Sequence, residues 1–391
     1  MTASSPSTSP SPQPLAGVRV LDLSRVLAGP WAGQMLADYG AEVIKVERPG
    51  VGDDTRTWGP PWWGEGEQRV AAYFLCANRG KRSVAIDIAS PQGIAQVQQL
   101  AAEADVLIEN YKVGQLAKYG LDAVSLRALN PRLIYCSITG YGQQGPLAHK
   151  AGYDFAIQAE AGLMSITGEK GGEPQKVGVA VTDIMTGVYA TTAILAALHE
   201  RHSTGRGRHI DASLFDVQVA MLANQASNEL IGHTHPTRMG NAHPNIVPYQ
   251  VFPTRDGHMV LAIGNDGQFE RFCLAAGHPN VAMDPAYQTN PERVKNRQAL
   301  IAMITAWTIQ RDTDAWGQLL ERVSVPCSPI LDVAQVMTHP HVLARGMRLD
   351  SVDPTVPPMI ANPMLMDGQR MTSDVAPPQL GGAQAVWGGQ K

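Results

Sequence analysis

The sequence predicts an α/β fold: a Rossmann-like, mostly parallel sheet with helices on both faces, together with a smaller α+β domain. Short apolar strands alternate with helical segments through the first half of the chain, which is typical of a parallel sheet covered on both sides. The chain has 391 residues, more than a single hydrophobic core usually contains. Beyond residue 223 the composition shifts to a stretch rich in His, Pro and Gly.

The predicted elements of the first half follow in order: strand 18–23, helix 31–39, strand 41–47, strand 83–88, a helix from Ser90 and Pro91, strand 105–110, helix 121–129 and strand 132–141. Gly40 ends the first helix, and a Ser followed by Pro is a common helix start. A fold of this kind places its ligand sites at the carboxyl ends of the strands. The loops there should therefore carry the function.

The second half predicts a hairpin at 251–264 with its turn at Arg255-Asp256-Gly257, then helices at 268–276, 293–307 and 313–322. The predicted domains are a disordered tail at 1–14, the large domain at 15–223, a connector at 224–246, the small domain at 247–330, and a connector that returns to the large domain at 331–391. The tail is rich in Ser and Pro and has no charged side chain.

Composition excludes several classes of function. A net charge of −4 argues against a nucleic-acid partner, and no apolar run was expected to span a bilayer. Cys76, Cys136, Cys273 and Cys327 form no CxxC pair, as expected for reduced thiols in a cytoplasmic protein. No GxGxxG follows the first strand, where the loop reads SRVLAGP, and no GxxxxGK[ST] or GxSxG motif is present. No metal site is predicted, and His233, His235 and His243 are interpreted as polar loop residues.

Asp183 is the candidate catalytic residue. The apolar segment 177–181 was expected to be a strand, and the positions after Asp183 repeat at helical spacing, with Ile184, Val188, Leu195 and Leu198 on one face. Asp183 should then lie near a helix N-terminus, which favours a negative charge. A carboxylate ionised at neutral pH can act there as a nucleophile. Most Asp residues at such junctions, however, only cap the helix.

The sequence from Thr182 to Gly187, TDIMTG, and the block TGRGRHIDASLFD at 204–216 resemble CoA-transferase family III, and the resemblance extends from about Leu15 to Met364. It implies that Asp183 is the nucleophile and that CoA esters are substrates, with no permanently bound cofactor. The partners implied are an acyl-CoA and a small carboxylic acid, with neither nucleic acid nor membrane, and ring-shaped subunits in an interlocked homodimer. The matching CoA contacts are Arg25, Val26, Ala28, Arg48, Lys81, Asn110, Tyr111, Lys118, Tyr141 and Leu214.

The chain departs from the oxalate-specific members of that family. Leu27 replaces a Gln, Thr139 replaces a Lys, and a glycine-run lid is replaced by Gly240-Asn241-Ala242-His243-Pro244. Residues 240–273 look more like succinyl-CoA:dicarboxylate transferases acting on glutarate or hydroxymethylglutarate. In such an enzyme the distal carboxylate would meet one of three side chains, namely His243, Arg238 or Arg56.

Two other functions remain open at this point. An α-methylacyl-CoA racemase has the same fold but needs an acid/base pair, and its motif carries His before Asp where this chain has Gly152-Tyr153-Asp154. A non-catalytic CoA-binding protein would use Asp183 only as a helix cap. The transferase interpretation requires instead that Asp183 form an aspartyl anhydride and then an aspartyl-CoA thioester.

Overall fold

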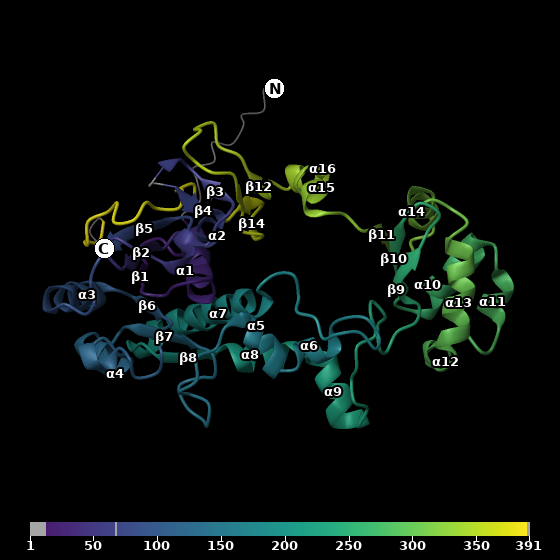
Figure 1. Ribbon diagram of the computed structural model, residues 1–391, viewed down its shortest axis with the longest axis horizontal. Coiled ribbons are helices and arrows are strands. Elements are labelled where there is room, and N and C mark those ends of the chain that lie inside the picture. Colours follow the sequence, from purple (N-terminus) through teal and green to yellow (C-terminus); the bar gives the residue numbers. More distant parts are fainter. Residues whose placement is uncertain (1–12, 67–68, 389–391) are drawn as a thin grey trace, which may run out of the picture. The chain divides into compact units, whose positions relative to one another are not determined.

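A computed structural model describes residues 13–66 and 69–388, so most of the predicted N-terminal tail lies outside the described residues. The chain forms two compact units (Figure 1). The first contains the described residues up to 163 together with 177–227 and 340–388, and the second contains 164–176 and 228–339. Residues 164–176, which the sequence analysis counted with the large domain, thus pack within the second unit.

The first unit is built on a six-stranded parallel sheet, as predicted. The strand order is β5-β2-β1-β6-β7-β8, and every neighbouring pair is parallel. The order reverses between β1 and β6, where such sheets bind their ligands. The strands are β1 (Arg19–Asp22), β2 (Glu42–Glu47), β5 (Lys81–Ala85), β6 (Val106–Glu109), β7 (Ile134–Thr139) and β8 (His209–Ser213).

Helices cover both faces of this sheet. Successive residues of a strand point to opposite faces: Val20 packs into one hydrophobic core with α1 and α7, and Leu21 packs into another with α3 and α4. Ser90 caps α3, accepting a hydrogen bond from Gly93 N, and Pro91 follows it, as predicted. The helices of the first unit are α1 (Ala28–Asp38), α2 (Ala72–Leu75), α3 (Pro91–Glu103), α4 (Ala123–Leu129), α5 (Asp154–Glu160), α7 (Val181–Thr204), α8 (Leu214–Met221) and α16 (Pro340–Ala344), with 3-10 turns η1 (Asp54–Thr57) and η3 (Ala117–Tyr119). The helices α6 (Leu163–Ile166) and α9 (Ala223–Gly232) each begin in the first unit and end in the second.

The segment before α7 corrects one prediction. Residues 177–180 have no regular structure, and the strand expected at 177–181 does not form. Val177 N donates to the side chain of Gln158, at its Oε1, at 2.9 Å instead of to a neighbouring strand. The helix begins at Val181 and places Asp183 in its first turn.

Helix α7 is also long and apolar enough to cross a membrane by length and composition, contrary to the sequence analysis, although half of its apolar window is buried inside the fold. Some of its polar side chains form hydrogen bonds within the helix itself. The hydroxyls of Thr186, Thr191 and Thr192 donate to carbonyl groups one turn earlier in the helix. Packing against α1 and the sheet accounts for its apolar composition.

The second unit is a small α+β body with its own core. Strands β9 (Tyr249–Pro253), β10 (His258–Ala262) and β11 (Cys327–Pro329) form an antiparallel sheet. The predicted hairpin is confirmed, and Thr254 N bonds to Gly257 O across its turn. The helices are α10 (Asp266–Ala276), α11 (Pro279–Met283), α12 (Asn290–Lys295), α13 (Arg297–Thr308), α14 (Thr313–Arg322) and α15 (Val333–Met337).

The C-terminal segment of the first unit covers the edge strand β5. Ala383 N bonds to Ser83 O at 3.0 Å, and Trp387 Nε1 reaches Leu100 O on α3. An uncovered parallel edge would present unpaired backbone groups. Three short ribbons complete the fold: β3 (Trp62–Trp63) with β4 (Val70–Ala71), β12 (Arg348–Leu349) with β13 (Met359–Ile360), and β14 (Leu365–Met366) with β15 (Gln369–Arg370).

Gly187 lets α7 approach the first turn of α1. A Cβ atom at this position would lie 2.8 Å from Ala28 O and 3.0 Å from Trp31 Cβ. We predict that Gly187→Ala lowers the free energy of unfolding by about 1–3 kcal/mol, because the helices must separate. The control is Gly317→Ala in α14, where nothing lies near the added methyl group. This substitution should instead raise the free energy of unfolding by roughly 0.5–1 kcal/mol. Denaturant titration of both variants tests this, and an unchanged Gly187→Ala protein would contradict it.

Candidate active site

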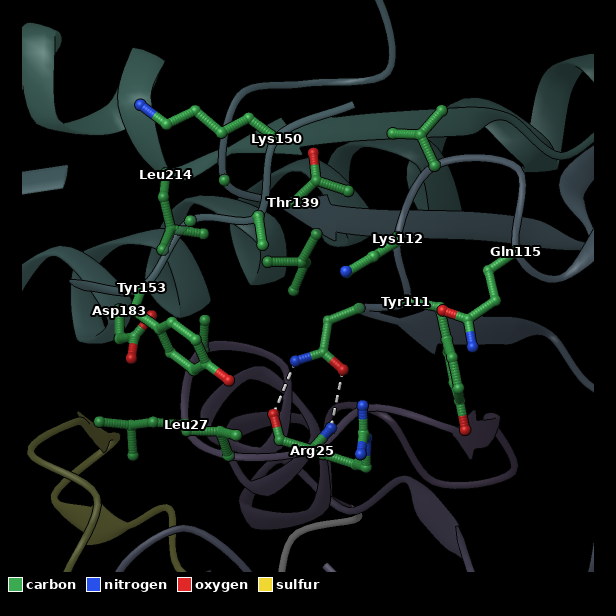
Figure 2. A pocket seen from close by; sticks show the side chains of 18 of the residues that line it. Arg25, Leu27, Tyr111, Lys112, Gln115, Thr139, Lys150, Tyr153, Asp183 and Leu214 are labelled. Carbon is green, nitrogen blue, oxygen red and sulfur yellow. Dashed lines mark hydrogen bonds between the residues drawn. The ribbon is translucent and has the colours of Figure 1, made fainter. Parts of the chain in front are cut away.

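A cavity of about 570 Å³ opens at the carboxyl ends of β1, β6 and β7, where the strand order reverses. This volume lies within the range of small-molecule sites. Loops after all three strands contribute to its wall, as do the first turns of α1, α7 and α8 (Figure 2). The lining residues include Arg25, Val26, Leu27, Ala28, Asp54, Trp58, Asn110, Tyr111, Lys112, Gln115, Thr139, Gly140, His149, Lys150, Gly152, Tyr153, Asp183 and Leu214.

Asp183 lines this cavity, and its side chain does not cap α7. Ala180 is the N-cap residue and contributes no side-chain hydrogen bond. The carboxylate of Asp154 takes that role, since its Oδ2 accepts from Thr182 N at 2.8 Å and from Asp183 N at 3.2 Å. Among the described residues, none donates a hydrogen bond to the carboxylate of Asp183. Its oxygens are therefore available to a ligand, on the side of the cavity away from Tyr111 and Gln115 (Figure 2).

The surroundings of Asp183 raise its pKa. Burial disfavours the charged form, and the negative charge of Asp154 adds to this effect, so that the pKa rises to about 7. The expectation of a fully ionised group at neutral pH is therefore wrong for the unliganded protein: at pH 7 the carboxyl group is divided between its two forms. The ionised fraction is poorly solvated, which favours attack on an electrophile.

The loop after β1 is held by side chains from two other segments. Asn110 accepts a hydrogen bond from Arg25 N at 2.9 Å and donates one to Arg25 O at 2.6 Å (Figure 2). The next residue, Val26, has φ +72°, which is strained for a β-branched residue. Its amide donates to Asp53 Oδ1 at 3.2 Å, and Asp53 forms a fully buried ion pair with Lys45. Such strain persists only where neighbouring groups fix it.

Most of the predicted site residues meet at this cavity: Asp183, Arg25, Val26, Ala28, Asn110, Tyr111 and Leu214. The guanidinium of Arg25 lies 5.4 Å from the ring centre of Tyr111 and pairs with Asp54 at 3.1 Å. Leu27 and Thr139, which distinguish this chain from the oxalate-specific sequences, also line the cavity.

Lys81 is a correction. Its ammonium group is fully buried and donates to Asp22 Oδ2, Pro30 O and Asn78 Oδ1 at 2.8–2.9 Å. All three donors are used inside the protein, so Lys81 cannot bind a phosphate. Arg79, two residues earlier, is likewise buried and pairs with Asp38 in the interior.

Arg56 is a second correction. It was a candidate for the distal carboxylate, yet its guanidinium binds both oxygens of Glu47 at 2.7 Å and is buried. His243 and Arg238 lie in the second unit, and their proposed role stays a prediction.

Besides Lys81, three predicted CoA contacts lie outside the cavity wall. Arg48 and Lys118 are exposed on segments that follow β2 and β6, and their contact with a ligand stays a prediction. Tyr141 is buried, and its hydroxyl donates to Glu160 Oε2 at 2.6 Å. Its ring does contact the ammonium group of Lys150, a cavity residue, at 5.0 Å.

Sequence reasoning missed several cavity residues, among them Lys112, Gln115, His149, Lys150 and Trp58. Lys112 follows Tyr111 directly, and its position after a strand could have identified it. His149 and Lys150 lie between β7 and α5 in a loop without a recognisable pattern.

Comparison with known proteins gives matches along nearly the whole chain. The family described as CoA-transferase family III matches residues 15–384. A succinate–glutarate CoA-transferase of Agrobacterium fabrum is 51% identical over 95% of this chain and 94% of its own length. The succinyl-CoA:glutarate CoA-transferase of Homo sapiens is 44% identical over 94% of this chain and 83% of its own length. A CaiB/BaiF family protein from Brucella suis, known from its crystal structure, is 49% identical in sequence. The two structures match with a TM-score of 0.83 over 95% of this chain and 97% of that protein.

The raised pKa of Asp183 predicts a pH-dependent change in stability. The folded protein keeps the proton up to about pH 7, whereas an unfolded chain loses it near pH 4, so this group reduces stability as pH rises across that window. We expect Asp183→Asn to remove the effect. The difference in free energy of unfolding between Asp183→Asn and the wild type should therefore shift in favour of the variant by on the order of 2 kcal/mol from pH 5 to pH 8.

The matched control is Asp216→Asn. Asp216 also occupies the first turn of its helix, α8, but is exposed, so its substitution controls for the loss of an acidic side chain at a helix start. Chemical denaturation at the two pH values makes the measurement. A pH-independent difference for Asp183→Asn would show that this carboxyl group titrates normally.

Proposed function

Because this chain belongs to CoA-transferase family III, it is a CoA-transferase, and we propose that it moves CoA from succinyl-CoA to glutarate through covalent intermediates on Asp183. The observation that carries the proposal is the carboxylate of Asp183, which faces the cavity while Asp154 caps the helix in its place. The similar enzymes named for succinate and glutarate support the choice of substrates.

The proposed reaction needs no external base. A carboxylate oxygen of Asp183 attacks the thioester carbonyl of succinyl-CoA, the carbon–sulfur bond breaks, and CoA leaves as a thiolate. The thiolate then attacks the aspartyl carbonyl of the mixed anhydride, which releases succinate and leaves an aspartyl-CoA thioester. Glutarate attacks that thioester, and the returning thiolate takes the glutaryl group and frees Asp183. Charge is conserved at every step, and no net proton is transferred.

We propose that the CoA moiety binds along the cavity wall formed by the loops after β1 and β6. The guanidinium of Arg25 and the ammonium group of Lys112 bring positive charge to this wall, and Lys150 adds another from the loop after β7. CoA carries a pyrophosphate and a ribose phosphate. The remaining proposed contacts are Val26, Ala28, Arg48, Asn110, Tyr111, Lys118, Tyr141 and Leu214. Burial removes Lys81 from this set.

The residues around Asp183 favour a larger acid than oxalate. Leu27 and Thr139 line the cavity where the oxalate-specific sequences carry longer polar or charged side chains. Tyr153 lines it as well, next to Asp154, at the position where the racemase motif carries a histidine. The histidine of the racemase motif is therefore absent from this place in the chain.

We also propose that two copies form an interlocked homodimer and that the enzyme works in the cytoplasm. Large apolar side chains at the start of α5, just before α7 and within α7 are exposed in the single chain: Tyr153 by 67%, Phe155 by 57%, Val179 by 58% and Tyr189 by 48%. A second copy would cover such a patch. The four cysteines are unpaired, which fits a reducing compartment.

The nucleophile assignment predicts a specific loss of activity. Asp183→Asn should fold and bind acyl-CoA but lose transfer from succinyl-CoA to glutarate by at least about 10³-fold, because the amide cannot form the anhydride. The control Asp216→Asn, at the same helical position outside the cavity, should keep wild-type activity. Mass spectrometric detection of glutaryl-CoA, with a panel of other free acids in parallel, makes the test. Comparable turnover by both variants would refute the assignment.

The dimer proposal makes a separate prediction. Native mass spectrometry should show the mass of two chains at micromolar concentration. Tyr189→Glu, which places a charge within the exposed apolar patch, should shift the population toward one chain. A wild-type protein that remains a single chain at the concentrations used for activity would contradict the proposal.

A further inference from the structure

The side chain of Asp154 contacts the backbone of Asp183, the proposed nucleophile. It is the first residue of α5 and is 9% exposed. Its Oδ2 accepts hydrogen bonds from two successive amides of α7, Thr182 N at 2.8 Å and Asp183 N at 3.2 Å, and its Oδ1 accepts from Gln158 Nε2 at 2.6 Å. One carboxylate therefore ties α5 to the backbone of the proposed nucleophile.

A wider network fixes the same segment. Gln158 Oε1 accepts from Val177 N at 2.9 Å, and Thr182 Oγ1 donates to Gln218 Oε1 on α8 at 2.6 Å. The N-cap residue of α7, Ala180, offers no side-chain acceptor of its own. The direction of the first turn of α7, and with it the direction of the Asp183 side chain, thus depends on groups from α5 and α8.

We propose that Asp154 is a positioning residue for the transfer reaction: it aims Asp183 into the cavity and keeps a second negative charge beside it, which makes Asp183 a stronger base and nucleophile. This inference rests on the proposed role of Asp183. It adds a function to a residue that would otherwise be only a buried helix cap.

The electrostatic part of the proposal follows from the groups that face Asp183. Asp154 contributes a negative charge from α5, and Tyr73 lies near Asp183 on α2, with Cys76 beside Tyr73. Burial and the charges of Asp183, Cys76 and Asp154 raise the pKa of Tyr73 to about 12, and burial raises that of Cys76 to about 11, so both are neutral near pH 7. Burial and Asp154 are the two causes of the raised pKa of Asp183. A more basic carboxylate attacks a thioester more readily.

The first test variant is Asp154→Asn, assayed with succinyl-CoA and glutarate. The pH dependence of kcat/KM for succinyl-CoA should have its midpoint near 7 in the wild type, because it reports the free enzyme. Removal of the neighbouring charge should lower the midpoint by about one unit. At pH 8, kcat should fall by roughly 10–100-fold, because the first turn of α7 loses part of its support.

A double variant separates charge from structure. In Asp154→Asn the new amide nitrogen faces Gln158 Nε2, and two donors repel each other. Adding Gln158→Glu restores an acceptor there while another oxygen still accepts from Val177 N, so all the hydrogen bonds of the network can re-form. In this double variant the negative charge lies on the side chain at position 158, which reaches the backbone of Asp183 only through the side chain at position 154. Stability and most of kcat should return in D154N/Q158E, while the pH midpoint stays lowered.

The outcomes are distinct. An unchanged pH midpoint in both variants, or wild-type kcat in D154N at pH 8, would overturn the positioning role. If D154N does not fold, D154N/Q158E alone decides on the basis of its pH midpoint. Asp183→Asn is assayed in parallel: an active Asp183→Asn protein would refute the proposed function itself, whereas an inactive one with unshifted Asp154 variants would refute only this inference.

Discussion

The close contact between Gly187 and the backbone of Ala28 is the constraint on which the site depends. It brings α7 against the first turn of α1, so that two helix N-termini meet at the carboxyl edge of the parallel sheet. The sheet order reverses at that edge and leaves a cavity there. Asp183 faces the cavity because α7 begins at that edge, and a shift of α7 by a fraction of an ångström would move its carboxylate.

Buried charges hold the opposite wall of the cavity. The ion pairs Lys45–Asp53 and Lys81–Asp22 are fully buried beneath the loop after β1. Lys45 also donates to Ser24 O, and Asp53 accepts from the amide of Val26. Ion pairs of this kind contribute little net stability, because their desolvation costs nearly as much as their attraction returns. Their evident effect here is geometric, since they fix a strained loop that lines the cavity.

The sequence and its family resemblance were sufficient to predict the parallel sheet, the hairpin of the second unit and part of the cavity wall, including Asp183, Arg25 and Asn110. Alternating apolar segments identify strands without tertiary information, and in a parallel sheet the ends of those strands must share an edge. The failures concern side chains whose partners are remote in sequence. Lys81 resembles an exposed loop lysine until β5 pairs with β2 and places it against Asp22. Asp154 caps a helix 27 residues later in the chain, and no local pattern reveals such a contact.

The central claim is that the carboxylate of Asp183 becomes covalently attached to CoA during turnover. The most direct measurement is to mix the protein with succinyl-CoA in the absence of an acceptor acid, quench with hydroxylamine, and sequence the modified peptide by tandem mass spectrometry. The account predicts a hydroxamate on Asp183 and on no other carboxyl group. Hydroxamate formation elsewhere, or a transfer-competent enzyme that shows none, would contradict it.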